Sequence, residues 1–386
     1  MGKIQIDVLT MRKFRLHYVL VFLGFSACQI QEKNSETQHD DSFAYSIDLN
    51  AESVEFIDQI ESISIFGFEE TDESLLNSSS LFLSYEDGII VIDEVSGSVY
   101  KFDSNGAYLS KFNRMGGGPE EYKSMQNTVY RDGLIETYDV SKQQMSRYNL
   151  DGNFMSALKL PYRANHVFFN DDRYLLSIEN DYKSDSSMHK IVFLDLEGKE
   201  YAQALPIDTP PPFPMRTNIN DFSMVEEQLL YAALLTDSVL VIDDTEGKPF
   251  IQFDFGEDWF WTDEMYATEN AMEALAGANK VWLYTWVLGP DRIEMTYSIS
   301  FSEIRCGYIE RSTGQFFEYK FKAWGGEYPG MLSIKFEVDK LLMVMTPDLL
   351  DVFINELGEE RYTLDGLSLE RIMKSENPVV VWVRFK

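Results

Sequence analysis

The chain has 386 residues, of which 45% are hydrophobic and 14% aromatic. This composition excludes a mainly disordered chain, and the length suits either two average domains or one large repetitive domain. With 33 Lys and Arg against 64 Asp and Glu, the formal net charge is −31. Nucleic acid and anionic lipid surfaces are therefore poor candidate partners, because both are negatively charged.

The first 27 residues have the order of a secretory signal. Three basic residues, Arg12, Lys13 and Arg15, come before an apolar run, 16–25. Small residues then lead from this run to Cys28. The pattern resembles the signal of bacterial lipoproteins, in which the cysteine is acylated and becomes the first residue. A plain signal peptide and a short buried helix are the alternatives, and Met11 would open a more usual signal than the first methionine. We predict a cell-envelope protein attached to the outer membrane through Cys28, on either of its sides.

The polar segment 28–44 is predicted to be a flexible tether, and 45–386 a folded domain. In this domain, short alternating runs of β-branched and aromatic residues recur around turns that contain glycine. The turn glycines are spaced by 46, 46, 49 and 67 residues and are Gly106, Gly152, Gly198, Gly247 and Gly314. A repeat of this length is typical of β-propeller blades and not of a sandwich. We predict an all-β fold with six blades of four antiparallel strands.

The sixth blade is predicted to be shared by the two ends of the domain. The run 379–386 matches the third strand of a blade, and no strand follows it. The alternating run 60–68 can pair with it, which closes the ring and hides two strand edges. Gly358 is an alternative sixth turn, but helical spacing in 351–356 and 367–373 argues against it. Rings of five or seven blades remain alternatives.

Three stretches make the chain similar to a known family. They are Phe-Asp-Ser-Asn-Gly at 102–106, Gly-Gly-Gly-Pro-Glu-Glu-Tyr at 116–122 and Asn-Pro-Val-Val at 377–380. They resemble the six-bladed β-propeller lipoproteins of the Bacteroides group, distant relatives of NHL-repeat propellers. The resemblance spans 45–386 and implies the fold, but little about function, because most members have no assigned activity. Glu120 stands where the family usually has a glycine.

Long connections are predicted to decorate one face of the propeller around a central funnel. In a four-stranded blade, the connection to the next blade and the connection between the second and third strands emerge on the same face. The irregular segments assigned to that face are 113–125, 210–214, 257–278 and 348–375. Trp259 and Trp261 lie in the largest insertion, with Trp282 and Trp286 after it, and are candidates for stacking on a glycan or peptide. The alternative, which is commoner, is packing between blades.

The glycine-rich segment 116–122 is a second candidate ligand site. Its backbone N–H groups and Arg114 could bind an anion, and Tyr122 lies beside them. Glu120 and Glu121 could act as acid and base only at a suitable separation. Because no helix with Lys-Ser or Lys-Thr follows the glycines, we favour a structural connector between blades.

Few motifs suggest catalysis. No His and Cys spacing matches a zinc site, no nucleophile elbow or phosphate-binding loop is found, and no metal or cofactor is predicted. Cys306 lacks an intrachain partner if Cys28 is lipidated, which predicts a buried thiol. We favour a monomeric, non-catalytic binding or scaffold protein whose decorated face takes a glycan, peptide or protein. The alternative is a propeller hydrolase or lyase that acts on an extracellular polymer with carboxylates or His166 in the funnel.

Overall fold

The computed structural model describes most of the chain after the predicted tether. The predicted signal, Cys28, the tether up to residue 42 and the proline run 210–214 lie outside the described residues. These residues are 43–77, 80–170, 172–178, 189–207, 221–225, 227–233, 235–268, 270–301 and 303–386.

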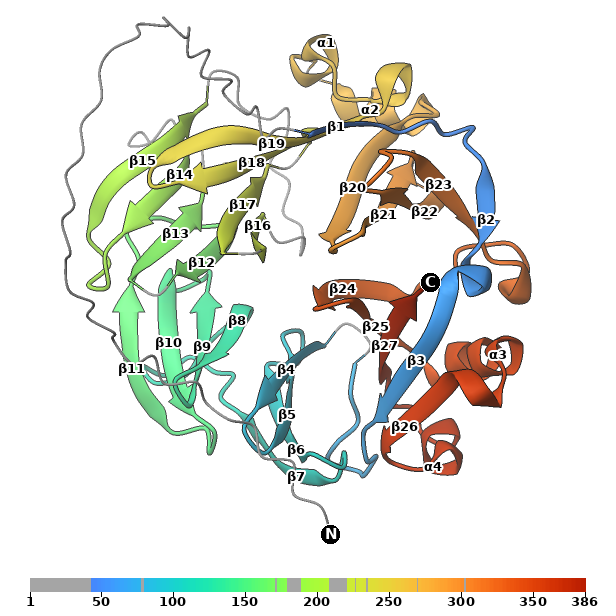
Figure 1. The fold of residues 1–386 in the computed structure, drawn as a ribbon. Helices are drawn as coiled ribbons and strands as arrows, with labels where there is room; N and C mark the ends of the chain where they lie inside the picture. The colour runs from blue at the N-terminus through green and yellow to red at the C-terminus, as the bar shows by residue number, and fades with distance from the viewer. Residues whose placement is uncertain are drawn as a thin grey trace, which may run out of the picture. The chain divides into compact units, whose positions relative to one another are not determined.

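Six antiparallel sheets lie in a ring, and in each the first strand is innermost (Figure 1). This confirms the predicted six-bladed propeller. The blades, from the inner strand outward, are blade 1 with β4 (Leu81–Tyr85), β5 (Gly88–Asp93), β6 (Ser98–Asp103) and β7 (Tyr108–Asn113); blade 2 with β8 (Gln126–Arg131), β9 (Leu134–Asp139), β10 (Gln144–Asn149) and β11 (Phe154–Lys159); blade 3 with β12 (His166–Asn170), β13 (Arg173–Ser177), β14 (His189–Leu194) and β15 (Glu200–Pro206); blade 4 with β16 (Phe222–Val225), β17 (Gln228–Ala232), β18 (Ser238–Asp243) and β19 (Glu246–Asp254); blade 5 with β20 (Val281–Leu288), β21 (Arg292–Ile299), β22 (Glu303–Glu310) and β23 (Phe316–Lys320); and blade 6 with β24 (Leu332–Glu337), β25 (Lys340–Met345), β27 (Val379–Phe385) and β3 (Ile60–Gly67).

The predicted turn glycines all fall at the hairpin between the third and fourth strands of blades 1 to 5. In blades 1 to 3 an Asp or Asn at the end of the third strand accepts two backbone N–H bonds from the turn, and a glycine with φ near +77° completes it. The acceptors are Asp103, Asn149 and Asp195, and the glycines are Gly106, Gly152 and Gly198. Blade 4 differs, because Asp244 takes the positive φ of 52° and Gly247 lies within β19. The glycine there marks the hairpin without forming its turn.

The ring closes between the two ends of the folded domain. β27 pairs antiparallel with β3, with Val381 opposite Ile65, which is the pairing that we expected. The expectation of four strands in every blade is wrong for blades 4, 5 and 6. A fifth strand lies parallel to the outer strand in each, because residues before β3 and within the last insertion use the free outer edge. These strands are β1 (Phe43–Ser46) on β19, β2 (Ser53–Glu55) on β23 and β26 (Tyr362–Gly366) on β3.

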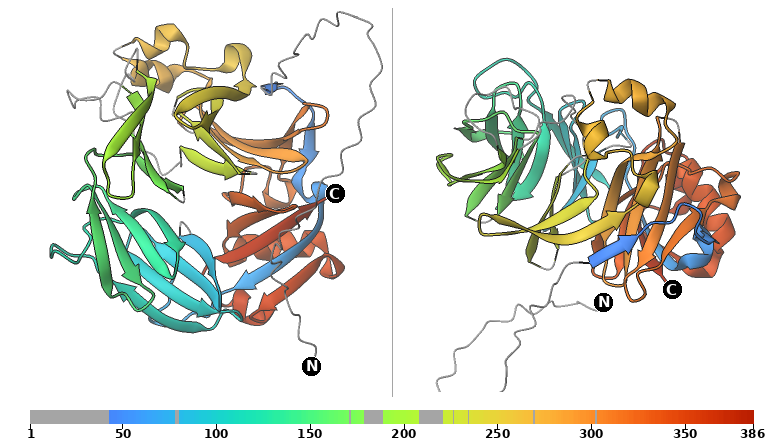
Figure 2. Two further views of the ribbon diagram at one scale, coloured as in Figure 1. Left: turned by 60° about the vertical axis from the view of Figure 1, so that its left-hand side comes forward. Right: turned by 90° about the horizontal axis from the view of Figure 1, so that it is seen from above.

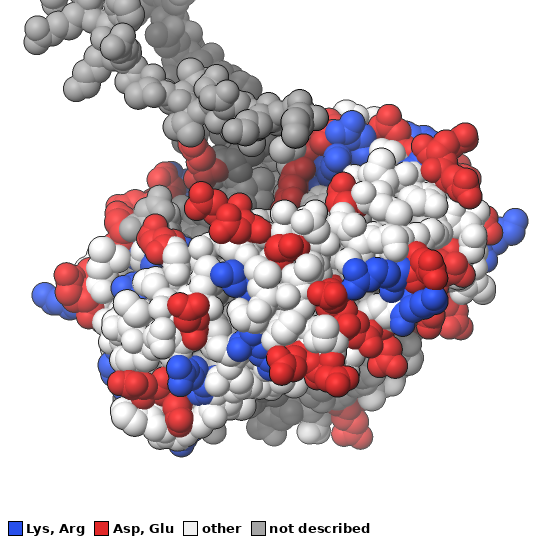
Figure 3. Space-filling model, turned by 90° about the horizontal axis from the view of Figure 1, so that it is seen from below, with Lys and Arg blue, Asp and Glu red and all other residues white. Residues whose placement is uncertain are grey.

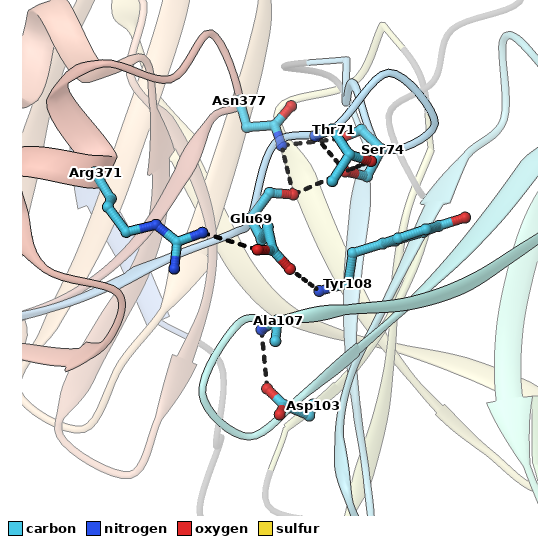
Figure 4. Close-up of polar contacts among 8 residues, drawn as sticks. All are labelled: Glu69, Thr71, Ser74, Asp103, Ala107, Tyr108, Arg371 and Asn377. Atoms are coloured by element: carbon cyan, nitrogen blue, oxygen red, sulfur yellow. Dashed lines mark hydrogen bonds and ion pairs between the residues drawn. The ribbon is translucent and has the colours of Figure 1, made fainter.

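A buried asparagine fastens the closed ring to blade 1. Asn377, 1% exposed, precedes β27 and contacts the segment that leads from β3 to β4. Its Oδ1 accepts from Leu76 N at 2.8 Å, and its Nδ2 donates to Ser74 O at 2.9 Å. Beside Asn377, Arg371 Nη2 donates to Glu69 Oε1 at 2.8 Å, and Tyr108 N donates to Glu69 Oε2 at 3.0 Å (Figure 4). These contacts join blade 6 to blade 1.

Helices form in two of the long insertions, one of which is 348–375, where the sequence has helical spacing. α1 (Asp263–Tyr266) and α2 (Ala271–Gly277) follow β19, and α3 (Pro347–Leu357) and α4 (Leu369–Met373) lie between β25 and β27. Figure 2, in its edge-on view, shows α1 and α2 on one face, whereas α3 and α4 lie at the side. Phe353 of α3 packs on Phe56 with ring centroids 5.9 Å apart, and β26 extends the outer edge of blade 6. The 348–375 insertion therefore covers that edge and does not surround the funnel, contrary to expectation.

The described part of the chain contains no helix with the length and apolarity needed to cross a membrane. Figure 3 shows one side of the molecule, on which acidic and basic side chains are interspersed and no continuous basic surface forms. This surface agrees with the charge balance of the sequence.

Candidate functional site

A cavity of about 420 Å³ lies at the centre of the ring, between the inner strands of blades 1, 4, 5 and 6. Among the described residues that line it, none carries a charge. Its wall combines aromatic rings with hydroxyl groups, chiefly Trp259, Trp282, Tyr284, Trp286, Ser80 and Thr285. The hydroxyl of Ser80, a residue that is 1% exposed, has no hydrogen-bond partner among the described residues. A buried hydroxyl without a hydrogen-bond partner is energetically costly, so this hydroxyl would gain from a hydrogen bond to a ligand.

The aromatic wall comes from β20 and the insertion before it. Trp282 and Trp286 lie four positions apart in β20. Both are half-buried, and both line the cavity. Trp259, 8% exposed, stacks on Phe255 with ring centroids 5.4 Å apart and holds the end of this wall.

Trp261 has a different position from Trp259. It is 6% exposed, its Nε1 donates to Trp282 O at 2.7 Å, and it lines an adjoining cavity next to α1, which Trp259 also borders. Both predicted tryptophans therefore belong to the core between blades 4 and 5, and only Trp259 borders the central cavity.

Polar groups from four blades gather on the face where the inner strands begin. His166 opens β12, and Asp221 comes directly before Phe222, a cavity-lining residue of β16. His166 Nδ1 lies 2.9 Å from Asp221 Oδ2, and the two residues are 4% and 5% exposed. Ser177 Oγ, at the end of β13, donates to the same Asp221 oxygen at 2.5 Å. Because this serine faces the carboxylate and not the imidazole, the group is not a serine-nucleophile triad.

Glu94 extends this polar group toward blade 1. It follows β5, and its Oε1 accepts from Thr128 N of β8 at 3.0 Å. Burial raises the pKa of Glu94, while the bonds from Thr128 and the positive charge of a protonated His166 lower it. Glu94 follows the second strand of blade 1, whereas His166 opens the inner strand of blade 3.

The glycine-rich segment is internally satisfied. Tyr122 is fully buried, and its hydroxyl donates to Gly97 O at 2.7 Å. The carboxylate of Glu121 accepts from Gly118 N at 2.7 Å, and Arg114 Nε donates to Gly152 O at 2.7 Å.

In this segment the protein's own carboxylate, from Glu121, occupies the place that an external anion would take. Glu120 is exposed, and its carbonyl accepts from Tyr148 OH at 3.1 Å. These contacts favour the structural connector over a ligand site.

The remaining candidate groups have structural positions. Cys306 is buried, as predicted, and burial raises the pKa of its thiol well above the usual value. No cluster of three or more His, Cys, Asp or Glu that could hold a metal ion occurs among the described residues. The polar cluster was missed from sequence, except for His166, because its members lie far apart along the chain and no motif connects them.

Comparison with known proteins agrees with this fold. A family model described as a domain of unknown function, DUF4934, matches residues 44–384. The chain belongs to this family. The DUF4934 match covers all six blades, including the outer strand β3 and the closing strand β27. None of the curated proteins matches the sequence.

Many solved structures are similar to this DUF4934 protein, and two of them come from Bacteroides species. One is a protein of Bacteroides fragilis NCTC 9343 that is predicted to be exported; it is 17% identical, with a TM-score of 0.68 over 89% of this chain and 99% of that one. The other is a member of the DUF4221 family from Bacteroides vulgatus ATCC 8482, 13% identical, with a TM-score of 0.49 over 85% of this chain and 97% of that one. At such identity the first similarity shows the shared fold.

Proposed function

We propose that this DUF4934 protein is an exported lipoprotein that binds a neutral saccharide in its central cavity. One observation carries the proposal: the cavity joins a wall of tryptophan and tyrosine rings to the unpaired hydroxyl of Ser80, without a charged side chain among its described lining residues. The C–H face of a sugar stacks well on such rings, and a hydroxyl meets its polar edge. A concave site of this volume suits a small ligand, whereas a protein partner usually binds across a broader surface.

The location is proposed on separate grounds. Basic residues, an apolar run and small residues before Cys28 form the order of a lipoprotein signal. The similar protein of Bacteroides fragilis is predicted to be exported, which supports the same compartment here. A net charge of −31 also suits a soluble domain held near a membrane by a lipid rather than by a basic surface.

Removal of one cavity ring tests the binding proposal. Trp286→Ala should weaken the affinity for a neutral oligosaccharide by at least about tenfold, or ~1.4 kcal/mol, because the stacking surface is lost. Titration calorimetry with a panel of neutral oligosaccharides measures this. Ser80→Ala should cause a smaller loss.

The matched control is Trp324→Ala. Trp324 packs on Phe321 and Phe353, outside the central cavity, so its removal should leave the affinity unchanged. An absence of binding across the panel, or an equal loss in both tryptophan variants, would contradict the proposal.

A further inference from the structure

A second cavity, of about 480 Å³, adjoins the central cavity. Four residues line both cavities, and they are Ser223, Trp286, Val287 and Ile334. They come from β16, β20 and β24, the inner strands of blades 4, 5 and 6. The two cavities therefore lie next to each other, and Trp286 belongs to the walls of both.

The second cavity lies further along the ring axis than the central cavity. Because each blade places its first strand innermost, the three inner strands run in the same direction. On each strand the residues of the central cavity come earlier and those of the second cavity come later, namely 222–223 and 223–225 on β16, 282–287 and 286–288 on β20, and 333–334 and 334–336 on β24. The lining of β20 alone extends from Trp282 to Leu288, roughly 20 Å at the usual rise of a strand. This length suits an extended ligand.

Aromatic rings follow one another along this path. Trp282 and Trp286 line the central cavity, and Phe336 of β24 lines the second cavity. Trp282 already uses its Nε1, which donates to Ser300 O, so stacking on its ring face would not compete with that bond. Phe336 lies against Gly289, where a Cβ would meet the ring at 2.6 Å, so residue 289 has to be small for the ring to take this position. Successive rings suit a chain of sugar units, because each unit presents a C–H face.

The wall and the rim of the second cavity suit an uncharged ligand. Among the described residues that line it, only Lys335 carries a charge, and its Nζ lies 2.8 Å from Glu337 Oε1. Val338 at the rim is 90% exposed and has a φ of 60°, which a β-branched residue rarely adopts. Met224, on the other side of this cavity, is also exposed. Large apolar side chains without cover are typical of a surface that a ligand contacts.

We propose that the ligand of the central cavity is a linear neutral oligosaccharide that continues along the ring axis into the second cavity. Trp282, Trp286 and Phe336 are its successive stacking surfaces. Ser80 in the central cavity binds one end of the chain, and the second cavity holds the other end. The affinity then depends on the length of the chain until both cavities are filled. This inference rests on the proposed saccharide binding and adds the shape of the ligand.

Titration calorimetry of the full chain with three length series tests the proposal. The series are cello-, xylo- and malto-oligosaccharides, each from the disaccharide to the hexasaccharide. In at least one series the affinity should rise by about tenfold or more with length and then level off, because sugar units beyond the filled cavities make no contact.

Phe336→Ala removes the aromatic ring of the second cavity. This variant should lower the affinity for the hexasaccharide by about tenfold and leave the affinity for the disaccharide unchanged. Phe336→Leu keeps an apolar side chain next to Gly289 and gives the same answer if Phe336→Ala fails to fold. The matched control is Phe317→Ala, which should change neither affinity, because Phe317 stacks on Tyr308, with ring centroids 5.2 Å apart, outside both cavities.

The outcomes separate this inference from the proposed function. Equal affinities along every series that binds, or Phe336 variants that affect the disaccharide and the hexasaccharide equally, would overturn the axial oligosaccharide and leave the binding function standing. An absence of binding in all three series would overturn both.

Discussion

Glu294 of β21 shows how burial decides the behaviour of a single residue. Tyr319 OH donates to its Oε1 at 2.9 Å, and Arg292 Nη1 lies 3.9 Å from the same oxygen. Burial still outweighs both contacts and raises the pKa of Glu294 to about 7. The protonated form is therefore favoured in the folded state, whereas in the unfolded chain the carboxyl group ionises near pH 4.5.

This shift predicts a loss of stability as the pH rises. The stability that Glu294 contributes is fully present below about pH 4.5 and is lost as the pH rises through about 7. Between these values the folded state binds a proton that the unfolded chain has released. The free energy of unfolding should fall by up to ~3 kcal/mol over this window, since each pKa unit corresponds to about 1.4 kcal/mol. Urea unfolding between pH 4 and 8 measures the slope.

In this experiment Glu294→Gln should flatten the slope, because the amide does not ionise. The control is Glu257→Gln at an exposed position, which should keep the natural slope. If natural protein and Glu294→Gln have parallel profiles, the pH dependence has another origin.

At the scale of elements, the repeated hairpin and the connection before β27 contribute to the fold in different ways. The hairpin glycine of blade 2 adopts a φ of 76°, and a Cβ at Gly152 would meet Phe112 at 2.6 Å. Gly133 has nearly the same φ, 77°, but open space around it. The positive φ of the turn is therefore enough to explain why residue 133 is glycine. At Gly152 the close contact with Phe112 of the neighbouring blade is a second reason why no larger residue fits.

The connection before β27 is expected to contribute strongly to stability. Asn377→Ala should lower the free energy of unfolding by about 1–3 kcal/mol, because Leu76 N and Ser74 O are left in a buried place without partners. Thermal unfolding followed by circular dichroism should show a lower midpoint. The matched variant Asn50→Ala changes an exposed asparagine and should leave the midpoint unchanged; equal midpoints in both variants would show that this connection is not important for closure.

At the scale of the whole molecule, the six blades form a ring with many acidic side chains on its surface and a central cavity lined by aromatic side chains. Strands β1 and β2 run along the outer edges of blades 4 and 5 before β3 completes blade 6, so the segment 43–67 contacts half of the ring (Figure 1). Covering those edges also removes free strand edges that favour aggregation. The cavity is a property of this assembly, because its wall takes strands from four blades.

The proposed anchor is tested on the whole protein in its native membrane. Cys28→Ser should move the protein from the membrane fraction to the soluble fraction, because the residue proposed to carry the lipid is removed. Fractionation and immunoblotting measure the distribution. The internal control is Cys306→Ser, which changes the buried thiol and should leave the protein with the membrane; persistence of Cys28→Ser there would contradict lipidation.

Much of the fold could be predicted from sequence because its signals are local. Alternating apolar residues and an Asp or Asn with a glycine three residues later specify the outer hairpins of blades 1 to 3 within about ten positions. The pairing of 379–385 with 60–67 followed from the same count, since one strand lacked a partner at each end. The added strands β1, β2 and β26 could not be predicted, because they pair in parallel at an outer edge and carry no hairpin turn of their own.

The sequence by itself determined the repeat, the number of blades and the way the ring closes, because each depends on residues near one another in the chain or on a missing partner strand. Only the tertiary structure decided that Trp261 is core, that Glu121 fills its own loop, and that His166 and Asp221 of neighbouring blades meet. His166 and Asp221 lie 55 positions apart in the chain, and only the packing of consecutive blades brings them together.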